Sequence, residues 1–317
     1  MLEILTITFP FFALVGCGFI AVRRHWLPLA AIPGLNGFVL FFALPCLLYR
    51  FGATTPIASS LNPGVMLTHL VAGLLMLGSI VAICRARNLD WNNAAFVALV
   101  GTFPNTGYMG VPLLVALLGT AAAGPAIATI LVDLVITSSL GIALSRLGSA
   151  EAHGARAAAL HALRGVLANP MPWAILAGAA SSAGGFALPQ PVMQTLGLLA
   201  DAASPVALFT IGAVLARSGS SAFAANTVGE AIGVATMKLL LHPLLMLLVG
   251  AAMIRSGIPL DTFALKVIVL VAALPCASNI VMLAERFDAD SARVARIIML
   301  STALAFLTFS GAVALLT

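Results

Sequence analysis

Two polar segments interrupt apolar stretches at corresponding points of the two halves of the chain. Amide and hydroxyl side chains there offer neutral hydrogen-bond donors and acceptors. Inside hydrocarbon each unpaired backbone group costs several kcal/mol, so such breaks persist only where protein or a water-filled cavity satisfies them. Matched breaks are typical of binding sites in secondary transporters. The candidate substrate-binding residues are Pro104, Asn105, Thr106 and Gly107 in the first break, and Pro275, Ser278 and Asn279 in the second.

The chemistry of both breaks favours an anion. Neither break carries Asp or Glu, whereas a cation exchanger is expected to place carboxylates there. The helices that begin after Asn105 and after Pro275 are expected to direct their N-terminal N–H groups into the breaks, each end worth about half a positive charge. The alternative is that the polar side chains only cap the broken helix ends.

Charged residues within the apolar stretches are candidates for ion coupling. A charge at the bilayer centre costs roughly 2.5 to 3.5 kcal/mol, so each needs a partner, a cavity or a role. We select Asp133, Asp201 and Lys238 as coupling candidates. A structural pair between Asp133 and Lys238 is an equally good interpretation of these two residues. We interpret His69 and His242 as hydrogen-bonded helix contacts rather than a proton relay.

The composition predicts an all-α integral membrane protein. Of the 317 residues 62% are hydrophobic and 8% are charged, and the mean hydropathy is +1.13. Apolar runs of about twenty residues match the length that crosses a bilayer. The Gly, Pro and Arg residues that separate these runs predict ten transmembrane helices, near residues 4–22, 31–51, 64–84, 92–118, 122–145, 167–184, 192–216, 229–254, 262–285 and 292–316.

The basic residues predict the orientation in the membrane. Eleven of the fifteen Lys and Arg residues fall at odd-numbered connections between the expected helices. The positive-inside rule then places these connections in the cytoplasm and both termini outside it. The net charge of +5 therefore reflects this bias and requires no nucleic-acid partner.

Recurring Gly and Pro residues suggest an internal duplication. Gly37 and Pro45 recur as Gly197 and Pro205, an offset of 160 (197 − 37 and 205 − 45), and Pro104 recurs as Pro275, an offset of 171 (275 − 104). A repeat of five helices enters the membrane from the opposite side, which gives two inverted repeats. Chance recurrence of these abundant residue types is the alternative.

This organisation divides the chain into three segments. We expect a first five-helix repeat over 1–145, a cytoplasmic linker over 146–166, and a second, inverted repeat over 167–317. Within the linker, Leu160 and Leu163 lie at helical spacing beside His161 and Arg164, which predicts a short amphipathic helix.

Several other classes of protein lack support in the sequence. The chain has no H-E-x-x-H, G-x-S-x-G or P-loop motif, so we expect neither an enzyme nor an ATP-driven pump, and we assign no catalytic residue. Cys17, Cys46, Cys84 and Cys276 are isolated, so we expect no metal, cofactor or disulfide. A channel or a transporter-like receptor remains an alternative.

Seven segments, taken in order, resemble the auxin efflux carrier family of membrane transporters. Any one of them is a weak match, but their order along nearly the whole chain is specific. They are Leu35–Pro45, Asn105–Leu113, Asn169–Pro170, Ala203–Gly212, Lys238–Pro243, Pro275–Glu285 and Leu300–Thr308.

The resemblance implies a fold like that of bile acid sodium symporters, in which broken helices 4 and 9 cross within a core domain beside a scaffold domain. It also implies a multi-pass protein of the bacterial inner membrane that carries a small carboxylate such as malonate or malate, with a homodimer as the expected assembly. The chain lacks the long central loop of the best-known plant members, so auxin is not the expected substrate. Protons or the membrane potential are the expected driving force, with sodium coupling as the alternative.

Overall fold

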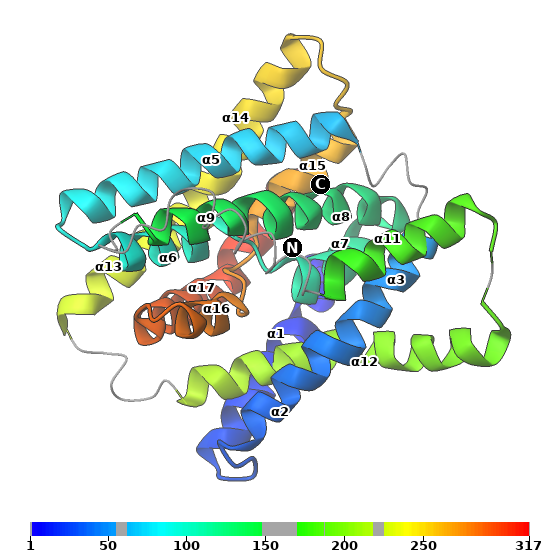
Figure 1. Ribbon diagram of the computed structural model, residues 1–317, viewed down its shortest axis with the longest axis horizontal. Helices are drawn as coiled ribbons and strands as arrows, with labels where there is room; N and C mark the ends of the chain where they lie inside the picture. The colour runs from blue at the N-terminus through cyan, green and yellow to red at the C-terminus, as the bar shows by residue number, and fades with distance from the viewer. Residues whose placement is uncertain (1, 55–61, 148–169, 187, 218–224, 317) are drawn as a thin grey trace. The chain divides into compact units, whose positions relative to one another are not determined.

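The described part of the chain is almost entirely helical. The computed structural model describes residues 2–54, 62–147, 170–186, 188–217 and 225–316 (Figure 1). Over these residues the only extended pairing is an isolated antiparallel bridge between Pro104 and Cys276. Among the described residues, six helices are long and apolar enough to cross a membrane: Ala31–Thr54, Pro63–Ala86, Thr120–Ser145, Gln190–Arg217, Val228–Arg255 and Ser291–Leu316.

The helices form two compact units, and each unit draws on both halves of the chain. Unit 1 comprises Met1–Asn62, Gly107–Ala128 and Asn169–Gly219, and unit 2 comprises Pro63–Thr106, Thr129–Ala168 and Ser220–Thr317. The spatial units therefore do not follow the sequence segments 1–145 and 167–317. The linker 146–166 and its expected amphipathic helix lie outside the described residues, apart from Arg146 and Leu147.

Unit 1 is built on the long helix α12. Helix α12 packs against both α1 and α3, and α3 packs in turn against α11. Between α2 and α3 the helix continues through a π-helical turn, η1, which ends just before Leu44 and Pro45. The helices of this unit are α1 (Leu2–Arg23), α2 (Ala31–Phe38), η1 (Val39–Ala43), α3 (Leu44–Thr54), α7 (Val111–Leu118), η3 (Thr120–Ala122), α11 (Pro170–Ala183) and α12 (Gln190–Arg217).

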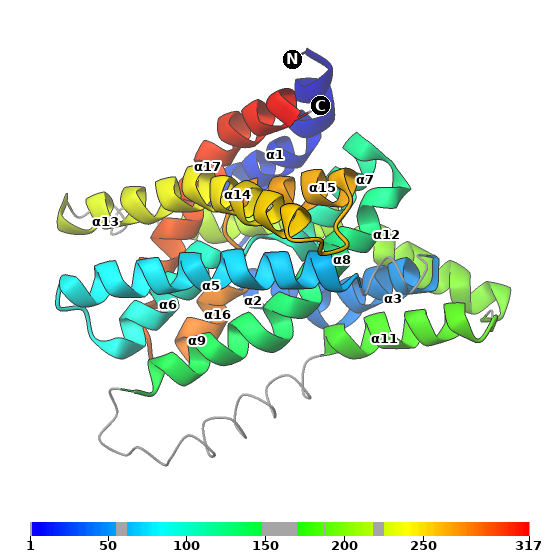
Figure 2. The ribbon, with the colours of Figure 1, turned by 90° about the horizontal axis from the view of Figure 1, so that it is seen from above.

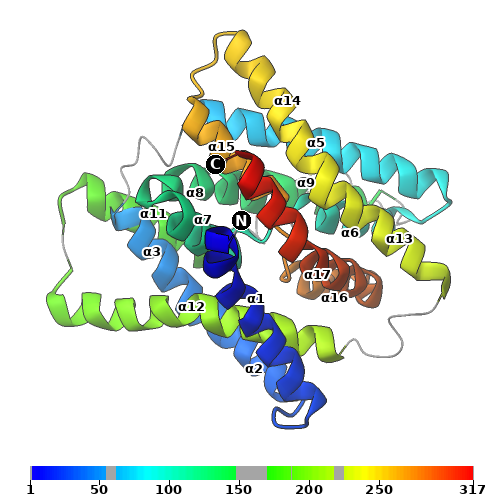
Figure 3. The same ribbon diagram turned by 180° about the vertical axis from the view of Figure 1, so that it is seen from behind.

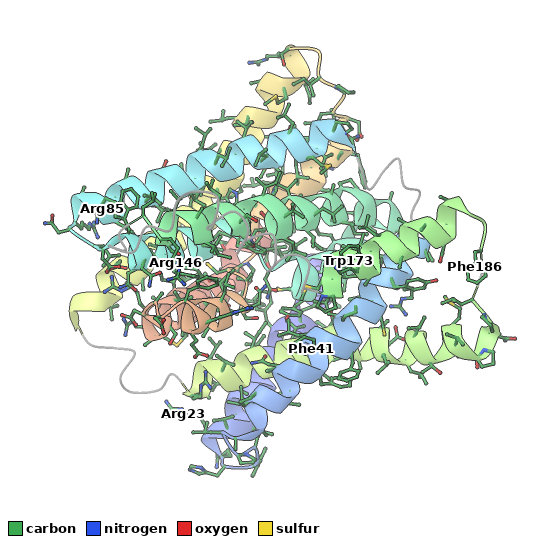
Figure 4. All side chains as sticks on the ribbon, viewed as in Figure 1. Arg23, Phe41, Arg85, Arg146, Trp173 and Phe186 are labelled. Atoms are coloured by element: carbon green, nitrogen blue, oxygen red, sulfur yellow. The ribbon has the colours of Figure 1, made fainter. Side chains whose placement is uncertain are left out.

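Unit 1 also presents large apolar side chains on its surface. Phe41 and Trp173, both labelled in Figure 4, are exposed, as is Leu198 on α12. Exposed aromatic and aliphatic side chains on apolar helices suit a lipid environment.

Four glycines let two helix pairs of unit 1 approach to backbone contact. A Cβ atom on Gly18 of α1 would overlap the backbone of Phe209, and one on Gly212 of α12 would overlap the backbone of Val15. The α3–α11 pair repeats this arrangement: a Cβ on Gly52 would lie 2.6 Å from the Ile175 carbonyl oxygen, and one on Gly178 would overlap the Tyr49 carbonyl oxygen. Small residues that permit close contact are the usual means of packing helices in membranes.

The two glycine pairs share one sequence offset. Gly178 and Gly212 follow Gly18 and Gly52 by 160 residues each (178 − 18 and 212 − 52). Their contacts keep the same offset, because Phe209 follows Tyr49, and Ile175 follows Val15, by 160 residues as well (209 − 49 and 175 − 15). This is the offset that Gly37 and Pro45 show in the sequence.

Unit 2 surrounds two short buried helices with longer ones. Helix α14 packs against α5 and α15, while α17 packs against α6, α13, α15 and α16. Figure 3 shows α13 and α14 running on as one rod, joined through η6. The helices are α5 (Pro63–Ala86), α6 (Trp91–Thr102), η4 (Asp133–Thr137), α9 (Ser138–Ser145), α13 (Ala225–Thr236), η6 (Met237–Leu241), α14 (His242–Arg255), α15 (Thr262–Ala273), α16 (Ile280–Arg286) and α17 (Ser291–Leu316).

Two elements join the units along the chain. The π-helical turn η2 (Thr106–Gly110) leads into α7, and α8 (Ala123–Val132) leads into η4. Each element begins in one unit and ends in the other.

The buried helices α6 and α15 match each other in detail. Both contain 12 residues, and both begin at an aspartate, Asp90 or Asp261, whose carboxylate accepts a backbone N–H three residues on. Their first and last residues differ by 171 (262 − 91 and 273 − 102), which is the offset between the two breaks. Both are buried in unit 2 over most of their length, and each ends where a break begins.

Basic residues gather at one end of unit 2. Arg85 ends α5 and Arg146 follows α9, and Figure 4 shows both toward the same end of this unit. Arg85 stacks on Trp91 and Arg146 on Phe287, with 4.8 and 5.1 Å from the guanidinium carbon to the ring centroid.

We predict that alanine at Gly18 or Gly212 destabilises the protein, although Gly to Ala in a helix normally stabilises it by about 0.5 to 1 kcal/mol. Overlap with the facing backbone should cost about 1 to 3 kcal/mol. Thermal unfolding of the purified protein in detergent measures this. The matched controls are Gly16→Ala on α1 and Gly197→Ala on α12, where an added Cβ meets nothing within 4 Å. A melting temperature that falls equally in all four variants would contradict the close approach.

Candidate functional site: a crossover of two broken helices

The two breaks lie against each other in the interior of unit 2. The Asn105 backbone N–H donates to the Pro275 carbonyl over 2.9 Å, and the Ala277 N–H donates to the Phe103 carbonyl over 3.0 Å. These reciprocal bonds satisfy backbone groups that the end of each helix leaves free. An isolated antiparallel bridge between Pro104 and Cys276 joins the segments that follow α6 and α15, both of which are labelled in Figure 2.

A third helix supports the crossover. The Cys276 backbone N–H donates to Ser301 Oγ on α17 over 3.2 Å, and Ser301 Oγ donates in turn to the Ile298 carbonyl over 3.0 Å. The breaks are thus closed by protein rather than left to solvent. The Asn105 N–H is used by the second break and is not free to bind an anion.

The polar side chains of the breaks do not cap the helices. Asn105 and Thr106 are 3% and 2% exposed, and their Oδ1 and Oγ1 atoms have no hydrogen-bond partner within the described residues. Asn279 occupies the N-cap position of α16 but forms no capping bond. Thr102, one turn before the break, also has an unpaired buried hydroxyl. The capping interpretation therefore fails for these side chains, which remain available to a ligand.

The remaining break residues differ in burial and in the unit to which they belong. Pro104 and Pro275 are buried and lie where the two breaks meet, and Ser278 and Asn279 are half-buried at the start of α16. Gly107 belongs to unit 1, where an added Cβ would meet only the Leu44 side chain, at 3.9 Å.

A buried acidic group lies on the π-helical turn η4. Asp133 Oδ1 is 3.1 Å from His69 Nε2 on α5 and accepts a bond of 3.1 Å from Thr137 Oγ1. Both side chains of the His69–Asp133 pair are 2% exposed. Asp133 is therefore paired with His69 rather than with Lys238, which corrects the pairing that the sequence left open.

A buried basic group lies on the π-helical turn η6. Lys238 is 0% exposed, and its Nζ donates to the Ala272 carbonyl over 2.8 Å and lies 2.9 Å from His242 Nδ1. Ala272 lies near the end of α15, so Lys238 contacts the helix that leads into the second break. Turns of π-helix are frequent at functional sites.

The third coupling candidate is in a different environment. Asp201 is in unit 1, where its Oδ1 accepts a 2.7 Å bond from Arg50 Nη1, and its side chain is 69% exposed. Exposed pairs of this kind contribute about 0 to 1 kcal/mol. The charge of Asp201 therefore requires no functional explanation, because solvent reaches it, whereas the charges of Asp133 and Lys238 are buried.

Sequence reasoning undervalued the two histidines. His69 and His242 complete the buried polar groups of unit 2, yet each was interpreted as an ordinary helix contact. The available signal was position, since each lies within an apolar run and His242 follows Lys238 by one helical turn. Their partners are 64 and 4 residues away (133 − 69 and 242 − 238), and only the folded chain shows the first of these.

Unpaired polar atoms are concentrated in unit 2. Buried side-chain atoms in native proteins nearly always have a hydrogen-bond partner, so each exception requires an explanation such as water or a ligand. Within the described residues every exception belongs to unit 2: His69 Nδ1, Thr102 Oγ1, Asn105 Oδ1, Thr106 Oγ1, Asp133 Oδ2, His242 Nε2 and Arg296 Nε. An apolar interior with donors and acceptors left free can bind a small polar solute. Over the same residues, no three His, Cys, Asp or Glu side chains are placed to hold a metal.

Comparison with known proteins places the chain among membrane transporters. A family model described as "Membrane transport protein" matches residues 4–313. The chain belongs to this family, in which the auxin efflux carriers are also found. The resemblance noted in the sequence is thereby confirmed.

Individual relatives are 28% to 37% identical to the chain over the aligned residues. A protein of Rhizobium meliloti, provisionally named a malonate transporter, is 28% identical over 98% of this chain and 95% of its own length. The uncharacterized transporter YfdV of Escherichia coli is 31% identical over 62% of this chain and 59% of its own length. Auxin efflux carrier component 3a of rice is 37% identical over only 27% of this chain and 14% of its own length.

We predict that Asp133→Ala destabilises the protein far more than Asp201→Ala. Loss of Asp133 leaves a buried imidazole unpaired, which should cost about 1.5 to 3 kcal/mol, whereas loss of the exposed Asp201 should cost less than about 1 kcal/mol. Melting temperatures of the two variants in the same detergent provide the comparison. Equal losses would show that the His69–Asp133 contact is not formed.

Proposed function

We propose that the protein is a secondary active transporter of a small carboxylate, with malonate as the first substrate to test. The observation that carries this proposal is the set of unpaired buried side-chain atoms at and around the crossover of unit 2. A soluble anion needs hydrogen-bond partners to replace its water, and Asn105, Thr106 and Asn279 could provide them. Rotation of the Asn105 amide exchanges Oδ1 and Nδ2, so this residue can donate as well as accept.

The buried charges support an anion as the substrate. In the described part of the chain, the buried residues with full charges are Asp133, Lys238 and Arg296. The interior therefore carries an excess of positive charge, while the crossover itself is neutral. The malonate transporter named among the relatives adds independent support for a dicarboxylate.

Coupling to protons is assigned to the His69–Asp133 pair. A buried carboxylate beside an imidazole can exchange a proton when the charge nearby changes. Lys238 contacts the end of α15, the helix that leads into the second break, and is the buried cation of the same unit. Asp201 is the weaker of the candidates because solvent reaches its side chain.

We further propose that the chain consists of two inverted five-helix repeats within a ten-helix fold. The offset of 160 among the glycine contacts of unit 1 and of 171 between α6 and α15 supports this duplication. Unit 2 then serves as the core domain, since it contains the crossover, and unit 1 serves as the scaffold. In this proposal the core moves against the scaffold to give alternating access. The protein is a homodimer in a bacterial inner membrane, with both termini outside the cytoplasm.

Sodium coupling is the second candidate. The free atoms at the break, Asn105 Oδ1 together with Thr102 and Thr106 Oγ1, are oxygens, which are the ligands that hard cations prefer. Asp133 Oδ2 adds a carboxylate in the same unit. A sodium ion that binds with the carboxylate would account for these acceptors.

We predict that Asn105→Ala and Asn279→Ala each abolish uptake of labelled malonate into proteoliposomes. Each variant loses a polar group that has no structural partner, so its melting temperature should stay close to that of the unmodified protein. Asn36→Ala on α2 of unit 1 is the matched control and should transport normally. Normal uptake by both crossover variants would rule out the crossover as the binding site.

We predict that a pH gradient, and not a sodium gradient, drives accumulation. Asp133→Asn should lose accumulation driven by the pH gradient but retain exchange of internal for external malonate, because exchange requires no net proton movement. Replacement of sodium by choline at fixed pH should leave uptake by the unmodified protein unchanged. A strong dependence on sodium would instead favour the second candidate.

A further inference from the structure

One buried cation in unit 2 has no partner. Arg296 lies in the second turn of α17 and is 8% exposed, and its Nε is buried without a hydrogen bond. Over the described residues no ion pair or hydrogen bond involves its guanidinium. A guanidinium stays charged in proteins and carries five donors, so a buried guanidinium nitrogen without an acceptor is unfavourable.

The surrounding helices provide no counter-ion for Arg296. Helices α6 and α15, which pack against α17, contain no Asp or Glu. The acid of α13, Glu230, accepts from Arg293 Nη1 over 3.1 Å. The acid of α16, Glu285, is exposed.

The neighbouring Arg293, in contrast, has acidic hydrogen-bond acceptors for its guanidinium. Arg293, one turn earlier on α17, bonds Glu230 through Nη1 and Asp290 through Nε, the latter over 3.4 Å. Asp290 also accepts the Arg293 backbone N–H over 2.9 Å. Glu230 and Asp290 are therefore committed to Arg293, whereas Arg296 Nε has no acceptor.

We propose that Arg296 binds a carboxylate group of the transported anion at a second site, separate from the crossover. Arg296 precedes Ser301, which supports the crossover, by five residues, or about 7.5 Å along the helix. An anion held there lies between the N-terminal end of α17 and the crossover. A planar guanidinium suits a carboxylate because it can donate two parallel hydrogen bonds. The choice of a carboxylate over other oxyanions rests on the proposed function, whereas the presence of an anion site does not.

The test compares Arg296→Met with Arg293→Met in detergent free of anionic lipid. Without added anion, Arg296→Met should melt at or above the temperature of the unmodified protein, because a buried unpaired charge is removed. Arg293→Met should melt lower, because it leaves Glu230 and Asp290 without their partner. A melting temperature that falls as far in Arg296→Met as in Arg293→Met would overturn the proposal, since it would reveal a structural partner.

Ligand titrations complete the test. Added malonate should raise the melting temperature of the unmodified protein. Asn105→Ala should keep part of this rise, because Arg296 still binds the anion. The double variant Asn105→Ala, Arg296→Met should show no rise. An equal shift with and without Arg296 would overturn the site. A shift with inorganic phosphate or phosphatidylglycerol but none with malonate would overturn the carboxylate assignment.

Transport separates this site from the proposed function. If malonate is carried, Arg296→Met should raise the KM for uptake about tenfold or more with a smaller change in kcat, as expected for a residue that binds before the crossover. An unchanged KM would contradict this role. If malonate shifts the melting temperature through Arg296 but is not carried, the anion site stands and the proposed function fails.

Discussion

The structure of unit 2 depends on the need to pair every backbone group inside an apolar interior. Two helices end in the middle of that interior, and each leaves carbonyl and N–H groups that no water can reach. Two reciprocal hydrogen bonds, between Asn105 and Pro275 and between Phe103 and Ala277, satisfy part of this need. The equal lengths of α6 and α15 and their aspartate caps are consistent with this pairing, because the two helix ends must lie at the same depth for their backbones to meet.

This solution gives the unit a polar centre that its stability does not require. Once the backbones have paired with each other, the side chains of Asn105, Thr106 and Asn279 have no capping role. Keeping unpaired polar atoms in an apolar core opposes folding, so their presence is better explained by function than by stability. Unit 1 shows the contrast, since its helices meet through glycine backbone contacts and, among its described residues, it contains no buried unpaired side-chain atom.

The sequence alone was sufficient for features that depend on composition and local order. Apolar length indicated a helical membrane protein, the Pro and Asn residues located both breaks, and the order of seven segments identified the family. Features that depend on contacts between distant residues were not accessible. The pairing of Asp133 with His69 requires α5 and η4 to be neighbours, and hydropathy carries no information on that. The offset of 160 was visible only in Gly37 and Pro45, whereas the glycines at backbone contact could not be separated from the many other glycines.

The central claim, that the crossover binds the transported anion, is tested most directly by an experimental structure of the protein determined with saturating malonate in a lipid environment. The account predicts ligand density at the crossover, with carboxylate oxygens within hydrogen-bond distance of the Asn105 and Asn279 side chains. Density confined to another part of the protein, or an empty crossover at a malonate concentration that saturates binding, would contradict it.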